Sequence, residues 1–226
     1  MSKHLNRDLE ALEQELLAQS SIVEKMILGA CRAMTEMRVD HYSQIIEDEG
    51  IIDRGEVRIE EECLKILALH QPVAVDLRRV ATVLKINVDL ERIADLAVNL
   101  GERAQSLVNF PLFPFPSQLE EMVGFSTSMV RDALDAFVRL DVDLARDVCL
   151  RDEQVDELNR QIIDDLQDLV RNQTGDIEPA LQYFSASRHI ERIADHATNI
   201  AEDVIYLVDG EIARHRHKYL SSYPLD

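Results

Sequence analysis

Tryptophan is absent from this chain of 226 residues, and glycine and proline are scarce, with 7 and 6 copies. Few helix breakers remain, so the composition favours long amphipathic helices over a sheet-rich fold. No run of about 18 uncharged apolar residues occurs, and the N-terminal residues interrupt their apolar positions with charge. We therefore expect neither a membrane span nor a signal peptide.

Basic residues are also scarce: the chain has 24 Lys and Arg against 43 Asp and Glu, which gives a formal net charge of −19. That charge repels the phosphate backbone of nucleic acid, so cations and basic protein surfaces are the expected partners. The three cysteines, Cys31, Cys63 and Cys149, form no CxxC pair. They are interpreted as small buried hydrophobes in a reducing compartment, in preference to a zinc site.

The residues that are abundant follow a helical period. Apolar side chains recur at three- and four-residue steps over 4–37, interrupted only by Gln19, and a second helix is predicted over 41–69. Gln71-Pro72 ends that second segment, and a third helix is predicted over 72–107.

The segment NFPLFPFPS carries three prolines and cannot continue a helix, so it is the predicted linker, with its three Phe side chains packed locally. After it, Ser117 is expected to cap a helix that runs to 139, and a second is predicted over 141–172. Thr174-Gly175-Asp176 separates this helix from a last one that reaches Val208, before Gly210. The predicted division is 1–108 for the first bundle, 109–117 for the linker, 118–210 for the second bundle and 211–226 for a flexible C-terminal tail.

The two halves repeat each other. ERIADLAVNLGE at 91–102 aligns with ERIADHATNIAE at 191–202 at an offset of 100, with eight of twelve positions identical. Acidic pairs ahead of these segments, Glu49 with Asp53 and Asp152 with Asp156, recur at an offset of 103. The predicted fold is all-α, with six long helices in two tandem three-helix bundles.

Each repeated segment presents one apolar and one acidic face. The stripe Ile86, Leu90, Ile93, Ala97, Leu100 and Ala104 marks the core side of the third helix. Polar oxygens stack on the opposite side, from Glu91, Asp95, Asn99 and Glu102 in the first repeat and Glu191, Asp195, Asn199 and Glu202 in the second. Like charges at i and i+4 destabilise a helix by about 0.2–0.5 kcal/mol per pair, so we expect cationic groups to neutralise these carboxylates.

Two sources of positive charge near these carboxylates stay open. Arg92, Arg103, Arg192 and other basic side chains could screen an ordinary solvated face. Alternatively, the carboxylates, with the acidic pair of a neighbouring helix, could supply six or more hard oxygen ligands to metal ions. A di-iron centre is disfavoured because no His follows a Glu at Glu-x-x-His spacing, and His189 and His196 are expected at the surface or behind the ligands.

An apolar patch precedes each acidic stripe on the same side of its helix. The patches comprise Leu77, Ala81, Leu84 and Val88 in the first repeat and Ile177, Leu181 and Phe184 in the second. A helix that is apolar on two sides is either enclosed within its own chain or offers one side to a partner. We expect enclosure, with packing of one bundle on the other covering at least one patch.

The segments QPVAVDLRRVATVLK, LKINVDLERIADLAVNLGE and SRHIERIADHATNIAEDVIYLVDGE resemble the PhoU family, whose likeness extends from residue 4 to about 211. The resemblance implies a cytoplasmic negative regulator of phosphate uptake and of the phosphate-starvation response. It also implies a homo-oligomer, with the dimer favoured. It further implies partners, namely the phosphate ABC transporter and a phosphate-sensing histidine kinase.

Some members of the family carry metal ions on E/DxxxD motifs, with Fe, Mg, Mn and Zn as candidate ions. That role transfers to Glu49, Asp53, Glu91, Asp95, Asp152, Asp156, Glu191 and Asp195, with Asn99 and Asn199 as further oxygen ligands. No nucleophile stands beside a base and no Gly-rich phosphate loop occurs, so no catalytic residue is expected. The alternative function is an acidic helical scaffold or chaperone-like protein without metal.

Overall fold

The computed structural model describes residues 3–37, 40–172 and 177–210, and every regular element in these ranges is a helix. The six helices are α1 Lys3–Glu36, α2 Asp40–His70, α3 Ala74–Leu107, α4 Ser117–Arg139, α5 Val142–Asn172 and α6 Ile177–Asp209. The predicted all-α fold is confirmed. The predicted break at 174–176 and the predicted tail at 211–226 lie outside the described residues.

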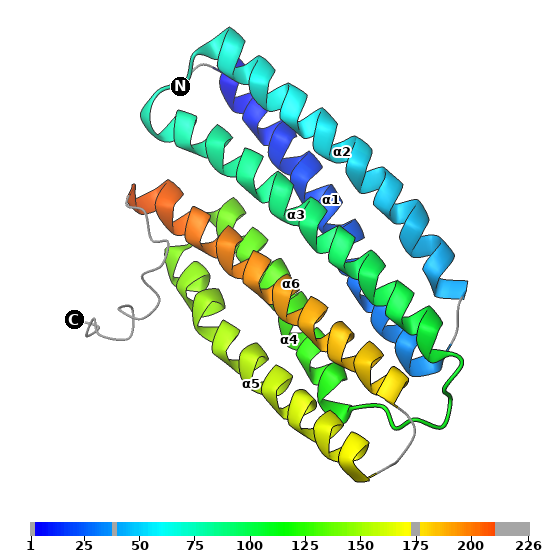
Figure 1. Ribbon diagram of the computed structural model, residues 1–226. Helices are drawn as coiled ribbons and strands as arrows, with labels where there is room; N and C mark the ends of the chain where they lie inside the picture. Colours follow the sequence, from blue (N-terminus) through cyan, green and yellow to red (C-terminus); the bar gives the residue numbers. More distant parts are fainter. Residues whose placement is uncertain (1–2, 38–39, 173–176, 211–226) are drawn as a thin grey trace, which may run out of the picture.

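The helices form two three-helix bundles side by side, α1 to α3 and α4 to α6 (Figure 1). Helices α2, α3, α6 and α5 make one layer in that order, and α1 and α4 lie behind it. The two bundles meet chiefly through α3 on α6, with a smaller contact of α1 on α4. In the described part of the chain, no helix is both long enough and apolar enough to cross a membrane.

The predicted apolar stripes form the core. All six residues of the α3 stripe, from Ile86 to Ala104, are buried, as are the three cysteines, which are unpaired thiols. Gln19, which interrupts the apolar stripe of α1, is buried against Gly55 of α2. Helix α2 runs through Gly50 and Gly55 without a break.

Helix α3 begins at Ala74, two residues from the predicted start near Pro72, and Gln71 and Ala74 adopt positive φ angles of 45° and 50° on either side of this segment. One local prediction was wrong. Ser117 does not cap α4: Pro116 holds the cap position, and the Ser117 hydroxyl donates to Oε1 of Gln118 at 3.2 Å. The side-chain cap instead occurs at α5, where Asp141 accepts from the backbone N–H of Leu144 at 3.0 Å.

Polar contacts set α3 and α6 antiparallel. Arg78 Nε donates to the Leu207 carbonyl at 3.2 Å near one end, and Arg103 pairs with Gln182 at 3.3 Å near the other. Between them, Lys85 Nζ lies 2.8 Å from Oδ1 of Asp203, whose side chain is only 3% exposed. The Lys85 ammonium also lies 5.3 Å from the centre of the Tyr206 ring, a cation–π contact.

The segment before α4 packs through its aromatic side chains, as predicted. Phe113 stacks on Tyr183 of α6 with ring centres 5.8 Å apart, and Phe115 meets the same ring edge-on at 5.9 Å. Phe110 is also packed on the core. These contacts hold residues 110–115 against the second bundle.

Two helical glycines should respond oppositely to alanine. A Cβ on Gly101 would lie 2.7 Å and 3.1 Å from ring carbons of Tyr42, so we expect Gly101→Ala to destabilise the fold by about 1–3 kcal/mol. A Cβ on Gly124 would meet nothing within 4 Å, so Gly124→Ala should stabilise it by about 0.5–1 kcal/mol through backbone entropy. Urea unfolding of both variants measures this, and equal effects would contradict the packing of α2 on α3.

Candidate functional site

The first acidic cluster joins α2 to α3. Glu49 and Asp53 lie on α2 and face the charges of Asp95 and Glu102 on α3. Partial burial raises the pKa of Glu49 above its ordinary 4.5, and these three neighbouring carboxylates raise it further. The cluster therefore concentrates negative charge that the fold does not fully neutralise.

Glu91 belongs to the same cluster. Partial burial and the charge of Asp95 raise the pKa of Glu91, while Arg92 opposes them from 3.5 Å. The Asn99 amide donates to the backbone carbonyl of Asp95 at 2.9 Å. That bond uses the nitrogen of Asn99 and leaves its side-chain oxygen as the atom for a cation.

The second cluster joins α5 to α6. Burial raises the pKa of Glu191 and Asp195, and the charge of Asp156 on α5 raises both further. Arg188 pairs with Glu191 and lowers its pKa in part. Asp152 accepts from the Thr198 hydroxyl at 3.4 Å.

The two clusters are not equivalent at their ends. Glu102 is partly exposed and pairs with Arg103 at 3.0 Å, whereas Glu202 is buried at 6% exposure. The expectation that Glu202 projects onto the solvated side is wrong, since it lies close enough to the buried Cys149 of α5 to raise the pKa of that thiol. Asn199 is exposed, as expected, and so is Asp195 as a whole residue, although the side chains around it partly desolvate its carboxylate.

The two histidines beside the second cluster are engaged elsewhere. His196 Nδ1 lies 2.8 Å from Oδ1 of Asp89 on α3, within the contact between bundles. His189 Nε2 pairs with the Ser185 hydroxyl at 3.2 Å, and burial lowers its pKa. His196 therefore contributes to the contact between bundles, and His189 is bonded within its own helix.

The chemistry of the clusters suits hard cations, since carboxylate and amide oxygens are the donors that Mg²⁺, Mn²⁺ and Fe³⁺ prefer. Within the ranges that the structure describes, however, no three His, Cys, Asp or Glu side chains lie close enough together to hold a metal ion. The structure therefore brings the predicted ligands into two clusters without assembling a coordination shell.

The apolar patches on α3 and α6 are open to solvent, which contradicts the expected enclosure. Leu77 and Val88 are 45% and 47% exposed on α3, whereas Ala81 and Leu84 between them are half-buried and Leu84 packs on the core. Ile177, Leu181 and Phe184 on α6 are 58%, 58% and 41% exposed. The bundles pack through a different side of these helices, the one that carries Lys85 and Asp203. We refer to these surfaces as the Leu77 patch (Leu77, Ala81, Leu84, Val88) and the Ile177 patch (Ile177, Leu181, Phe184).

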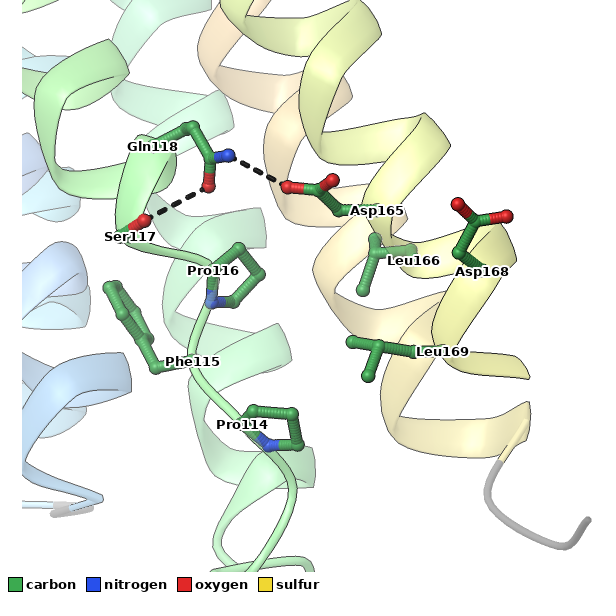
Figure 2. A pocket seen from close by; sticks show the side chains of 9 residues that line it. All are labelled: Pro114, Phe115, Pro116, Ser117, Gln118, Asp165, Leu166, Asp168 and Leu169. Carbon is green, nitrogen blue, oxygen red and sulfur yellow. Dashed lines mark hydrogen bonds between the residues drawn. The ribbon is translucent and has the colours of Figure 1, made fainter. Parts of the chain in front are cut away.

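A groove of about 400 Å³ lies in the second bundle, between the segment that precedes α4 and the last turns of α5 (Figure 2). Pro114, Phe115 and Pro116 form one wall, and Leu166 and Leu169 form the opposite one. The Gln118 amide donates to Asp165 across it at 2.7 Å. None of the predicted ligands lines this groove.

Sequence reasoning missed two members of the first cluster. Glu56 of α2 acts on the pKa of Glu91, and the Tyr42 hydroxyl lies near Glu49 and Glu102, whose charges add to burial in raising its pKa. Glu56 stands seven residues after Glu49, two helical turns along the same side, and that spacing could have identified it. Tyr42 carries no such signal.

Comparison with known proteins gives a consistent family. A sequence model of the PhoU domain matches residues 16–104 and 119–204. The phosphate-specific transport system accessory protein PhoU homolog of Pseudomonas aeruginosa is 38% identical over 216 residues, covering 95% of this chain and 89% of the relative. The homolog of Clostridium acetobutylicum is 33% identical over 210 residues, with 92% and 96% covered.

Solved structures agree. The crystal structure of PhoU from Pseudomonas aeruginosa superposes with a TM-score of 0.88 at 37% identity, covering 91% of this chain and 99% of that one. The phosphate transport system regulatory protein PhoU from Streptococcus pneumoniae superposes with a TM-score of 0.86 at 29% identity, with 92% and 98% covered.

The raised pKa of Glu49 predicts a pH-dependent stability difference. Because the folded state raises this pKa above 4.5, ionised Glu49 destabilises the fold at neutral pH, and that penalty vanishes once pH falls below about 4.5. Glu49→Gln should therefore raise the unfolding free energy at pH 7 by about 0.2–0.5 kcal/mol and lose that advantage near pH 4. Glu121→Gln on the exposed side of α4 is the control, and an equal gain there would contradict a local cause.

Proposed function

The chain belongs to the PhoU family, and we propose that it is an accessory protein that represses phosphate uptake and the phosphate-starvation response. The observation that carries this proposal is the tandem PhoU domain match across both bundles. Relatives that align over nearly their whole length bear the name phosphate-specific transport accessory protein. The Streptococcus pneumoniae neighbour is titled a regulatory protein.

The proposed mode of action is binding. A regulator of this kind reads the state of the phosphate ABC transporter and passes it to a sensor histidine kinase, by contacts that differ between two states. We propose that it works in the cytoplasm, beside the inner membrane through these partners, and as a homodimer. The long exposed faces of α3 and α6 support an interaction role.

We also propose that the two acidic clusters bind divalent or trivalent cations, with Fe, Mg, Mn and Zn as candidates. The support is electrostatic: Glu49, Glu91, Glu191 and Asp195 all have raised pKa values, to which neighbouring carboxylates contribute. A cation relieves that repulsion, and flexible glutamate side chains can turn toward it. The ions would be bound by Glu49, Asp53, Glu91, Asp95 and Asn99 in one cluster and by Asp152, Asp156, Glu191, Asp195 and Asn199 in the other.

Deleting the gene tests the regulatory role. We expect phosphate-starvation genes to be expressed even in phosphate-rich medium, and a plasmid copy of this chain to restore repression, as measured by a transcriptional reporter. Repression that is unchanged in the deletion strain would favour the scaffold alternative.

Chelation tests the cation proposal. A ligand at 100 times its dissociation constant adds about 2.7 kcal/mol to the folded state, so a chelator should lower the melting temperature of the wild type. The quadruple variant Glu91→Ala, Asp95→Ala, Glu191→Ala and Asp195→Ala should not respond, and without metal it should be as stable as the wild type or slightly more so. Stoichiometric metal in this variant, by elemental analysis, would place the site elsewhere.

A further inference from the structure

The exposed sides of α3 and α6 form one surface with internal two-fold symmetry. Equivalent residues of the repeats differ by 100, and the two helices run antiparallel, with Arg78 at Leu207 and Arg103 at Gln182. A rotation that exchanges the helices therefore places Leu77 on Ile177 and Leu84 on Phe184. Its axis passes between the two helices near Arg92 and Arg192.

Apolar and acidic areas alternate about this axis. The register set by the cross-helix contacts places the Ile177 patch beside the part of α3 that carries Asn99 and Glu102. It places the Leu77 patch beside the last turns of α6, where Leu207 accepts from Arg78. The two patches are thus separated by roughly 35 Å along the helices, as estimated from a rise of about 1.5 Å per residue. Each lies beside the other repeat's helix.

We propose that this surface binds a homodimeric protein along its own two-fold axis, with each partner subunit contacting one repeat through an apolar projection flanked by basic side chains. The inference deepens the proposed function, on which it rests, by specifying the symmetry and chemistry of the partner. A homodimer presents two identical surfaces related by two-fold rotation. A single chain can bind both surfaces of such a dimer in the same way only if it carries two equivalent patches related by a two-fold rotation. The Leu77 patch and the Ile177 patch are related in this way.

Charge favours such a partner over a second copy of this chain. The acidic clusters flank the patches, and each chain carries a net charge of −19. Two copies meeting through this surface would bring like charges together, whereas a basic partner surface is complementary.

Two-point attachment has a measurable consequence. Once one repeat is bound, the second contact forms within the same complex at high effective concentration, so both contacts contribute to the observed affinity. Damage to either patch should weaken binding by a similar factor, although the damaged residues lie in different repeats.

The variants are Leu77→Glu, Ile177→Glu and their combination, with Val138→Glu as the matched control. Val138 is 40% exposed on α4, in the layer behind the surface. Circular dichroism and melting curves confirm that each variant folds. The probes are the purified dimeric cytoplasmic region of the phosphate-sensing histidine kinase and the purified ATP-binding subunits of the phosphate transporter, titrated separately by calorimetry and analytical ultracentrifugation.

With at least one probe, we expect one chain per partner dimer and an affinity that falls with added salt. Each single variant should weaken binding about tenfold and the double variant further, while Val138→Glu binds like the wild type. Loss of binding from only one of the two single variants would overturn the symmetric arrangement.

Three further outcomes distinguish a failure of the proposed binding surface from a failure of the proposed regulatory function. Wild-type binding that all variants retain would overturn the surface while leaving the proposed function intact. Failure of the wild type to bind either probe would overturn the proposed function itself, and the inference with it. Dissociation of a wild-type oligomer by the same variants would assign the surface to self-association instead, against the inference.

Discussion

The antiparallel packing of α3 on α6 is the constraint on which the functional surface depends. Its centre is the ion pair between Lys85 and the nearly inaccessible Asp203, with the Tyr206 ring beside the ammonium. The Asp203 carboxylate is buried while the Lys85 side chain is 39% exposed, so the ammonium reaches from the surface to a buried charge. Removing Lys85 would take a cationic partner from a buried carboxylate, which is destabilising. The pair therefore helps to determine how one bundle sits on the other. Without that placement, neither the acidic clusters nor the apolar patches would share a surface.

The exposed side of this surface opposes the stability of the fold that carries it. Partial burial and the charges of neighbouring carboxylates raise the pKa of Glu49 on α2 and of Asp195 on α6, and large apolar side chains near these clusters remain exposed to water. The buried stripes of the same helices offset both penalties through the hydrophobic effect. Selection for stability alone would remove these clustered carboxylates and exposed apolar side chains, whereas a binding function accounts for their presence.

Symmetry between the repeats is real but incomplete. Glu102 pairs with Arg103 at the surface, while its counterpart Glu202 is buried near Cys149. Val88 of the Leu77 patch corresponds to Arg188, which pairs with Glu191. The two clusters therefore differ in charge and access, and two cation sites built on them would differ in affinity. Equivalent positions after duplication need not keep equivalent environments, since each helix meets different neighbours.

The sequence by itself determined the six helices, the repeat, the core stripe of α3 and the grouping of carboxylates on one side of each repeated helix. These features follow from a period of 3.6 residues, which any single helix expresses without reference to others. Tertiary structure alone decided which side of α3 meets α6, and hence that Leu77 and Ile177 stay exposed while Glu202 is buried. A helix with two apolar sides has two ways to pack, and the choice rests on contacts such as Lys85 with Asp203, about 120 residues apart, that no local pattern records.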